Sequence, residues 1–161
     1  ATAILALNRP EGAYIAHLGD SRAYLIRNRE ISQLTRDHSL VQRMLELGEI
    51  TPEEARVHPM RHIVLSGLGR QDEIEPEISS FKPQSGDYLI LCSDGLSDMI
   101  DDESIRHTAL KRRKSKTICS ALIQGALEAG GKDNVTVIVA KWKLMPNLTT
   151  CSEICLTHDK S

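Results

Sequence analysis

The stretch Asp87-Tyr88-Leu89-Ile90-Leu91-Cys92-Ser93-Asp94-Gly95-Leu96 decides how the rest of the chain is interpreted. Residues 88–92 form a continuous apolar run that is too short for a helix, and Ser93-Asp94-Gly95 behind it is typical of a turn. The pattern predicts a buried strand that carries Asp94 at its end. A carboxylate held on a rigid element suits metal binding or catalysis, whereas Asp-Gly pairs also commonly just turn the chain. This stretch alone leaves both interpretations open.

The composition indicates a single domain of 161 residues with a substantial core, since 40% of its residues are apolar. The 20 basic and 22 acidic residues give a net charge of −2, which provides no electrostatic attraction for nucleic acid or an anionic membrane surface. No apolar run approaches the ~18 residues of a membrane span. We therefore expect no nucleic-acid partner and no membrane partner.

The four cysteines are expected to be reduced thiols. Cys92 and Cys119 lie in apolar segments and are typical of small buried hydrophobic residues. Cys151 and Cys155 form a C-x3-C pair without the second ligand pair that a zinc site needs. This usage favours a cytoplasmic protein.

Strand patterns at 3–7, 13–18, 22–27 and 30–34 are separated by short turns, which predicts an antiparallel meander. Asp20 then lies at a strand end, as Asp94 does. An edge strand is expected at 74–81 and a buried strand at 135–140, with Asp133 just before it. Because the chain begins inside a sheet and without Met, we expect a fragment whose preceding part is absent.

Helices are expected at 40–47, stopped by Gly48, and after Thr51, where a capping box precedes a short helix. Two further helices begin at Asp101 or Asp102 and at residue 117. Residues 48–69, here called the flap segment, suit either a mobile cover over a site or an ordinary surface excursion. The basic run 111–114 favours a solvated helix end over a docking patch.

The three aspartates at strand boundaries could converge at one edge of a β-sandwich. Carboxylates without His or Cys partners select hard cations such as Mg²⁺ or Mn²⁺. Two such ions ~3.5–4 Å apart can activate a bridging water for attack on phosphorus. Spacing alone makes this a hypothesis.

Four stretches resemble, in the same order, the later motifs of the metal-dependent Ser/Thr protein phosphatases of type 2C, in their bacterial form. The flap segment, with Glu53-Glu54-Ala55 and His58-Pro59, is also similar to that family's flap. The resemblance covers about residues 3–142, the C-terminal two-thirds of such a catalytic domain. The stretches are Ala16-His17-Leu18-Gly19-Asp20-Ser21-Arg22, Leu34-Thr35-Arg36-Asp37-His38-Ser39, Leu91-Cys92-Ser93-Asp94-Gly95-Leu96 and Gly131-Lys132-Asp133-Asn134-Val135-Thr136.

The resemblance implies an α+β fold, a four-layer α-β-β-α sandwich of two antiparallel sheets that is incomplete at its N-terminus. It implies a phosphatase-like domain at 1–143, with a polar C-terminal tail at 144–161. The implied activity is hydrolysis of phosphoserine and phosphothreonine in proteins by a metal-activated water, with two or three Mn²⁺ or Mg²⁺ ions. The implied partners are phosphoprotein substrates in signal transduction, and a cognate Ser/Thr kinase is a further candidate partner.

The resemblance also implies roles for individual residues. Asp94 and Asp133 match the catalytic ligands of the principal metal, and Asp20 shares a weaker third metal with Asp94. Gly95 allows a tight backbone turn beside the ion. Arg22, by pairing with a carboxylate, and Asn134 brace the site. His38 and His58 match structural positions that anchor the flap.

The departures from the family pattern keep a second hypothesis open. An early acidic residue, an Asp-Gly pair whose Asp bridges both metals, and a phosphate-binding Arg have no counterpart here and would lie before Ala1. A non-catalytic binding or regulatory module is therefore the alternative to an active phosphatase.

Overall fold

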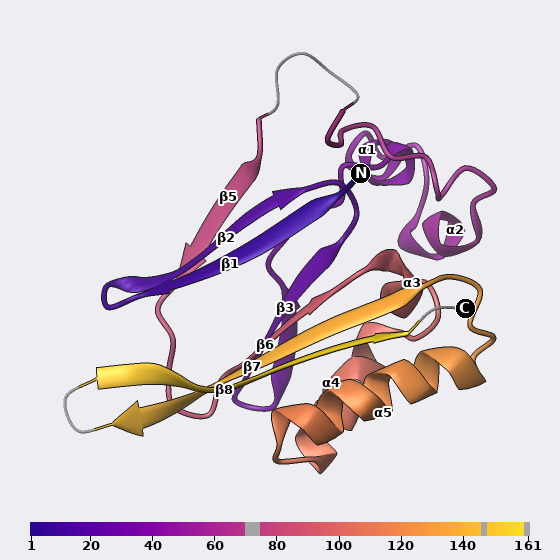
Figure 1. The fold of residues 1–161 in the computed structure, drawn as a ribbon. Coiled ribbons are helices and arrows are strands. Elements are labelled where there is room, and N and C mark those ends of the chain that lie inside the picture. Colours follow the sequence, from indigo (N-terminus) through magenta and orange to yellow (C-terminus); the bar gives the residue numbers. More distant parts are fainter. Residues whose placement is uncertain (70–74, 146–147, 160–161) are drawn as a thin grey trace.

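The computed structural model describes residues 1–69, 75–145 and 148–159. Two antiparallel sheets lie face to face, and the two longest helices lie beneath one of them (Figure 1). The three-stranded sheet has the order β1-β2-β5, with β1 at Ala3–Arg9, β2 at Gly12–Leu18 and β5 at Glu77–Phe81. The five-stranded sheet has the order β4-β3-β6-β7-β8, and its strands are β3 (Arg22–Arg27), β4 (Glu30–Gln33), β6 (Tyr88–Cys92), β7 (Val135–Met145) and β8 (Leu148–Asp159).

The predicted single meander is wrong, because the chain changes sheet between β2 and β3. β1 pairs with β2 and β3 pairs with β4, as the short turns predict, but β2 and β3 belong to different sheets. Gly19, with φ +111°, turns the backbone at the crossing in a conformation that favours glycine. Local turn patterns identify the two hairpins and do not specify the sheet that each one joins.

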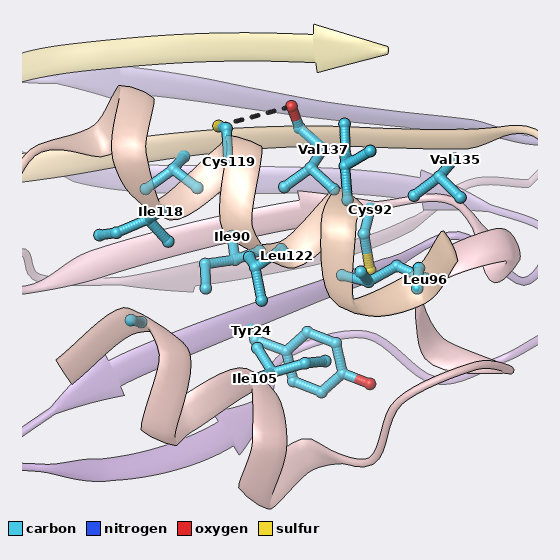
Figure 2. Close-up of a cluster of buried hydrophobic side chains, with 14 of the residues drawn as sticks. Tyr24, Ile90, Cys92, Leu96, Ile105, Ile118, Cys119, Leu122, Val135 and Val137 are labelled. Carbon is cyan, nitrogen blue, oxygen red and sulfur yellow. Dashed lines mark hydrogen bonds between the residues drawn. The ribbon is translucent and has the colours of Figure 1, made fainter. Parts of the chain in front are cut away.

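The predicted strand at 88–92 is confirmed as β6, which is buried on both faces. Leu89 and Leu91 pack toward the three-stranded sheet, in a cluster with Ile15 and Trp142. Ile90 and Cys92 pack on the other side, in the cluster between the five-stranded sheet and its helices that Figure 2 shows. Burial on both faces explains why this strand is a continuous apolar run rather than an alternating one.

Five helices complete the described structure: α1 (Leu40–Glu46), α2 (Pro52–Val57), α3 (Asp94–Ser97), α4 (Asp102–Lys111) and α5 (Ser115–Glu128). The capping box of Thr51 and Glu54 is present on α2, and Asp101 caps α4. α4 and α5 cover the five-stranded sheet, whereas Leu5 and Ile78 on the three-stranded sheet stay exposed. The α+β class is confirmed, with an outer helical layer on the five-stranded sheet. No helix in the described ranges is long and apolar enough to cross a bilayer.

The segment expected to be a polar C-terminal tail, residues 144–161, forms strands where the structure describes it. β7 continues to Met145, and β8 pairs antiparallel with it, with Val135 opposite Asp159 and Val139 opposite Cys155. Ile154 and Leu156 of β8 point outward, since they are 67% and 62% exposed. Cys and polar residues alternate with them on the half-buried side. Because these two apolar residues are exposed, the alternation that normally predicts a half-buried strand does not identify this strand.

Candidate metal centre

Asp94 is the first residue of the one-turn helix α3, directly after β6 and Ser93. The Ser93 hydroxyl donates to the Asn134 carbonyl at 3.2 Å and accepts from the Thr136 amide at 3.1 Å. The end of β6 is thereby tied to the start of β7. This tie places Asp94 beside the segment that carries Asp133.

Gly95 permits the same close approach. A Cβ built on Gly95 would lie 3.0 Å from the carbonyl carbon of Asn134 and would clash with its oxygen. Gly95 lies in the helical turn α3 and does not have a positive φ. Glycine is therefore required here by the lack of space for a side chain rather than by an unusual dihedral angle. Each aspartate is also held locally, since the Asp94 Oδ1 accepts from the Gly95 amide at 2.9 Å and the Asp133 Oδ1 from the Asn134 amide at 2.6 Å.

The predicted ligands interact electrostatically through Asp94. Burial, and then the charge of Asp133, raise the pKa of Asp94 above its usual range. Burial, and then the charge of Asp94, raise the pKa of Asp20. Asp133 is exposed. Half-buried carboxylates that repel one another fit a divalent cation, because its charge would offset both the burial and the repulsion.

The three carboxylates nevertheless do not form a compact ligand set. In the described ranges, they do not meet within 4.8 Å of one another, whereas His17, His38 and Glu77 do. Asp20 and Asp94 line a common pocket of about 470 Å³, and Asp133 lies outside its lining. The structure therefore brings Asp20 and Asp94 to one pocket and Asp133 to its edge, next to Asp94.

The flap segment contributes side chains to this pocket, among them the positively charged Arg61. Arg61 and His62 both line it, and both approach Asp98. The Arg61 Nε lies 3.8 Å and the His62 Nδ1 3.5 Å from the Asp98 Oδ2. The flap segment thus lies against the carboxylates of this pocket.

Sequence reasoning missed Asp98, Ser93 and Arg61. Asp98 lies four residues after Asp94, a spacing that places both side chains on one side of a helical turn, and this signal was present in the sequence. Ser93 was interpreted only as turn chemistry. Nothing in the sequence shows which residues of the flap segment face the pocket, so Arg61 could not be singled out.

Arg22 pairs with a carboxylate, as expected, and the partner is Asp37. Its Nε donates to the Asp37 Oδ1 at 3.0 Å and its Nη2 to Oδ2 at 2.7 Å. Burial lowers the pKa of Arg22, but the hydrogen bonds and charge of Asp37 outweigh this effect and raise it. Arg22 therefore remains charged and paired with Asp37 at the wall of the pocket.

The residues after Asp37 hold the loop that carries Asp20. The His38 amide donates to the Gly19 carbonyl at 2.7 Å, and the Gly19 amide donates to the His38 Nδ1 at 3.2 Å. His58 ends α2, and its Nδ1 accepts from the Met60 amide at 3.2 Å. Both histidines thus make local contacts with the backbone, His38 with the loop of Asp20 and His58 at the end of α2.

Comparison with known proteins identifies the pattern. The family model described as Protein phosphatase 2C matches residues 1–58 and 72–135. The chain is 46% identical over 125 residues to the protein phosphatase PhpP of Streptococcus pneumoniae, covering 78% of this chain and 51% of PhpP. It spans about half the length of that curated relative.

Two solved structures are similar to this fold. The serine/threonine phosphatase PstP/Ppp of Mycobacterium tuberculosis superposes with a TM-score of 0.83 and 40% identity, over 89% of this chain and 60% of that one. The catalytic domain of the phosphatase PstP in complex with two manganese ions gives a TM-score of 0.75 and 38% identity, over 86% of this chain and 56% of that one.

Proposed function

This chain belongs to the protein phosphatase 2C family, and we propose that it serves the metal-dependent hydrolysis of phosphoserine and phosphothreonine in proteins. The observation that carries the proposal is the junction of β6 with β7. There Ser93 and Gly95 bring Asp94 against the segment of Asp133, and both Asp94 and Asp20 are half-buried beside other carboxylates. A fold has little reason to maintain such repulsion unless a cation relieves it.

We assign Asp94, Asp133 and Asp20 to the binding of Mn²⁺ or Mg²⁺, in a centre of two or three ions. When bound, these ions supply an activated water and neutralise charge on the phosphoryl group. Asp94 and Asp20 present their oxygens to the pocket, and Asp133 adds negative charge next to Asp94. Arg22 keeps Asp37 and the loop of Asp20 in place, and Asn134 supports the close approach at Gly95.

The deciding experiment compares the chain with Asp94→Asn and with Glu30→Gln, a matched change of an exposed carboxylate on β4. Mn²⁺ binding is measured by calorimetry, and Mn²⁺-dependent hydrolysis is measured with p-nitrophenyl phosphate. We expect Asp94→Asn to weaken Mn²⁺ binding by at least about tenfold while Glu30→Gln leaves it unchanged. Unchanged binding in a folded Asp94→Asn variant would overturn the assignment of the metal centre.

Hydrolysis gives a separate answer. Activity that disappears in Asp94→Asn would establish catalysis by the chain itself. Metal binding without hydrolysis, in this chain and in one extended to the length of PhpP, would favour the regulatory module instead.

The substrates, partners and location remain proposals of the same kind. The family supports phosphoproteins as substrates and a Ser/Thr kinase as the opposing enzyme. A cytoplasmic location is supported by the two buried thiols of Cys92 and Cys119, which are free.

A further inference from the structure

A second group of metal-binding side chains lies apart from the carboxylate centre. His17, His38 and Glu77 each offer one donor atom, and these atoms lie within 4.8 Å of one another. His17 is on β2 and faces Glu77, its cross-strand partner at the start of β5. His38 comes from the segment before α1, and its ring centroid lies 4.9 Å from that of His17. Three segments far apart in the sequence thus contribute one donor each.

His17 is the unusual member of this group. It is only 2% exposed, and in the described part of the chain neither of its ring nitrogens has a hydrogen-bond partner. The Ser21 backbone lies near the ring but outside hydrogen-bond geometry. Buried polar atoms normally have a partner, so this ring calls for an explanation. Burial, and then the charge of His38, lower the pKa of His17, which keeps a lone pair available for a metal ion.

We propose that His17, His38 and Glu77 form a binding site for Zn²⁺ or a similar transition-metal ion, distinct from the site of Asp20 and Asp94. Two imidazole nitrogens and one carboxylate form a recurrent zinc donor set that leaves a fourth position for water. Imidazole donors favour Zn²⁺ over Mg²⁺ and Mn²⁺, which prefer oxygen.

The geometry is close to what such an ion requires. Zn–N distances of ≈ 2.0–2.1 Å in a tetrahedron place neighbouring donor atoms about 3.3 Å apart. The His38 Nε2 and the Glu77 Oε2 already lie 3.4 Å apart. His38 and Glu77 also line a pocket of about 600 Å³, which gives an ion a path to the site. The three donor atoms lie within 4.8 Å of one another, so binding of an ion requires them to approach by ~1.5 Å at most.

Binding of a metal ion through the His38 Nε2 would break one hydrogen bond of the His38 ring. Its Nδ1 accepts from the Gly19 amide, so the neutral ring carries its proton on Nε2. Coordination through Nε2 requires that proton to pass to Nδ1, and the Gly19 amide then loses its acceptor. The number of protons on the ring is unchanged. Metal binding should therefore perturb the Gly19 amide, directly before Asp20.

The test uses Co²⁺ as a spectroscopic probe for Zn²⁺, added to the metal-free chain. The key variant is Glu77→Gln, and the matched control is Glu75→Gln, which removes an exposed carboxylate from the same pocket. We expect visible absorption bands of tetrahedral Co²⁺ that Zn²⁺ abolishes, at least tenfold weaker binding in Glu77→Gln, and less than twofold change in Glu75→Gln. The Gly19 amide resonance should shift with Zn²⁺, and Asp94→Asn should retain the bands.

Three results would overturn the proposal. The first is the absence of tetrahedral bands in a chain shown by circular dichroism to be folded. The second is equal weakening by Glu75→Gln and Glu77→Gln, which would indicate unspecific attraction. The third is a thiolate-to-cobalt charge-transfer band, or loss of the signal in Asp94→Asn, which would assign the ion to cysteines or to the carboxylate centre.

Discussion

The carbonyl carbon of Asn134 lies 3.0 Å from the point that a Cβ on Gly95 would occupy. The two residues are the immediate neighbours of Asp133 and Asp94, so this backbone contact sets how closely the two carboxylates approach. A sheet that pairs β6 with β7 brings their ends together, and only glycine allows the last step. The proposed metal centre would depend on this contact as much as on the ligands.

Gly95→Ala should therefore lower the free energy of unfolding by about 1–3 kcal/mol, the usual cost of overpacking, and should weaken Mn²⁺ binding. Urea unfolding and calorimetry measure the two effects. The control is Gly125→Ala in the last turn of α5, where a Cβ meets nothing within 4 Å. This change should stabilise the chain by about 0.5–1 kcal/mol. Wild-type stability and metal affinity in Gly95→Ala would refute this account.

Arg22→Lys should separate support of the site from general stability. Arg22 and Arg27 stand at opposite ends of β3, and each forms a forked pair, with Asp37 and with Asp87. Arg27→Lys is the matched variant. Lysine cannot form either forked pair, so Arg22→Lys and Arg27→Lys should each lower the free energy of unfolding by about 1–3 kcal/mol.

Only the change at Arg22 should also alter Mn²⁺ binding, because Arg22 and Asp37 line the pocket and the pair at Arg27 does not. Calorimetric titration of the two variants side by side decides this. An equal loss of metal affinity in both would mean that the effect follows from stability alone.

Glu153→Ala should destabilise α5. The N-cap residue of α5, Lys114, makes no side-chain cap, and the Ser115 amide instead donates to the Glu153 Oε1 of β8 at 2.8 Å. Loss of this remote cap should cost about 1 kcal/mol, comparable to Asp101→Ala at the local cap of α4. Thermal unfolding measures both. If Asp101→Ala destabilises the chain and Glu153→Ala does not, β8 fails to dock against α5 in solution.

Stability should fall above about pH 9 because of two buried thiols. Burial raises the pKa of Cys92 and of Cys119 to about 12, whereas an unfolded thiol titrates near 8.5. Between these values the unfolded chain binds fewer protons, so the free energy of unfolding declines by up to ~1.4 kcal/mol per pH unit for each thiol. Urea unfolding from pH 8 to pH 10 should show this slope, and Cys92→Ala should reduce it. An identical slope in the variant would contradict the assignment.

The sequence by itself determined the elements whose signals lie within a few residues. The apolar run of β6, the capping box at Thr51 and Glu54, and the cap of Asp101 follow from short-range sterics and hydrogen bonds. The motifs around Asp20, Asp94 and Asp133 indicated the family through their resemblance to its motifs in the same order. The hairpins of β1–β2 and β3–β4 were likewise predictable from their turns.

Only the tertiary structure decided what depends on contacts between distant segments. It assigned the two hairpins to different sheets, and it paired β8 with β7 although Ile154 and Leu156 point outward. It placed Arg61 against Asp98, Glu153 at the start of α5, and His17 beside Glu77. These relationships arise because packing of two sheets and their helices brings together residues up to tens of positions apart, and no local periodicity records which partners will meet.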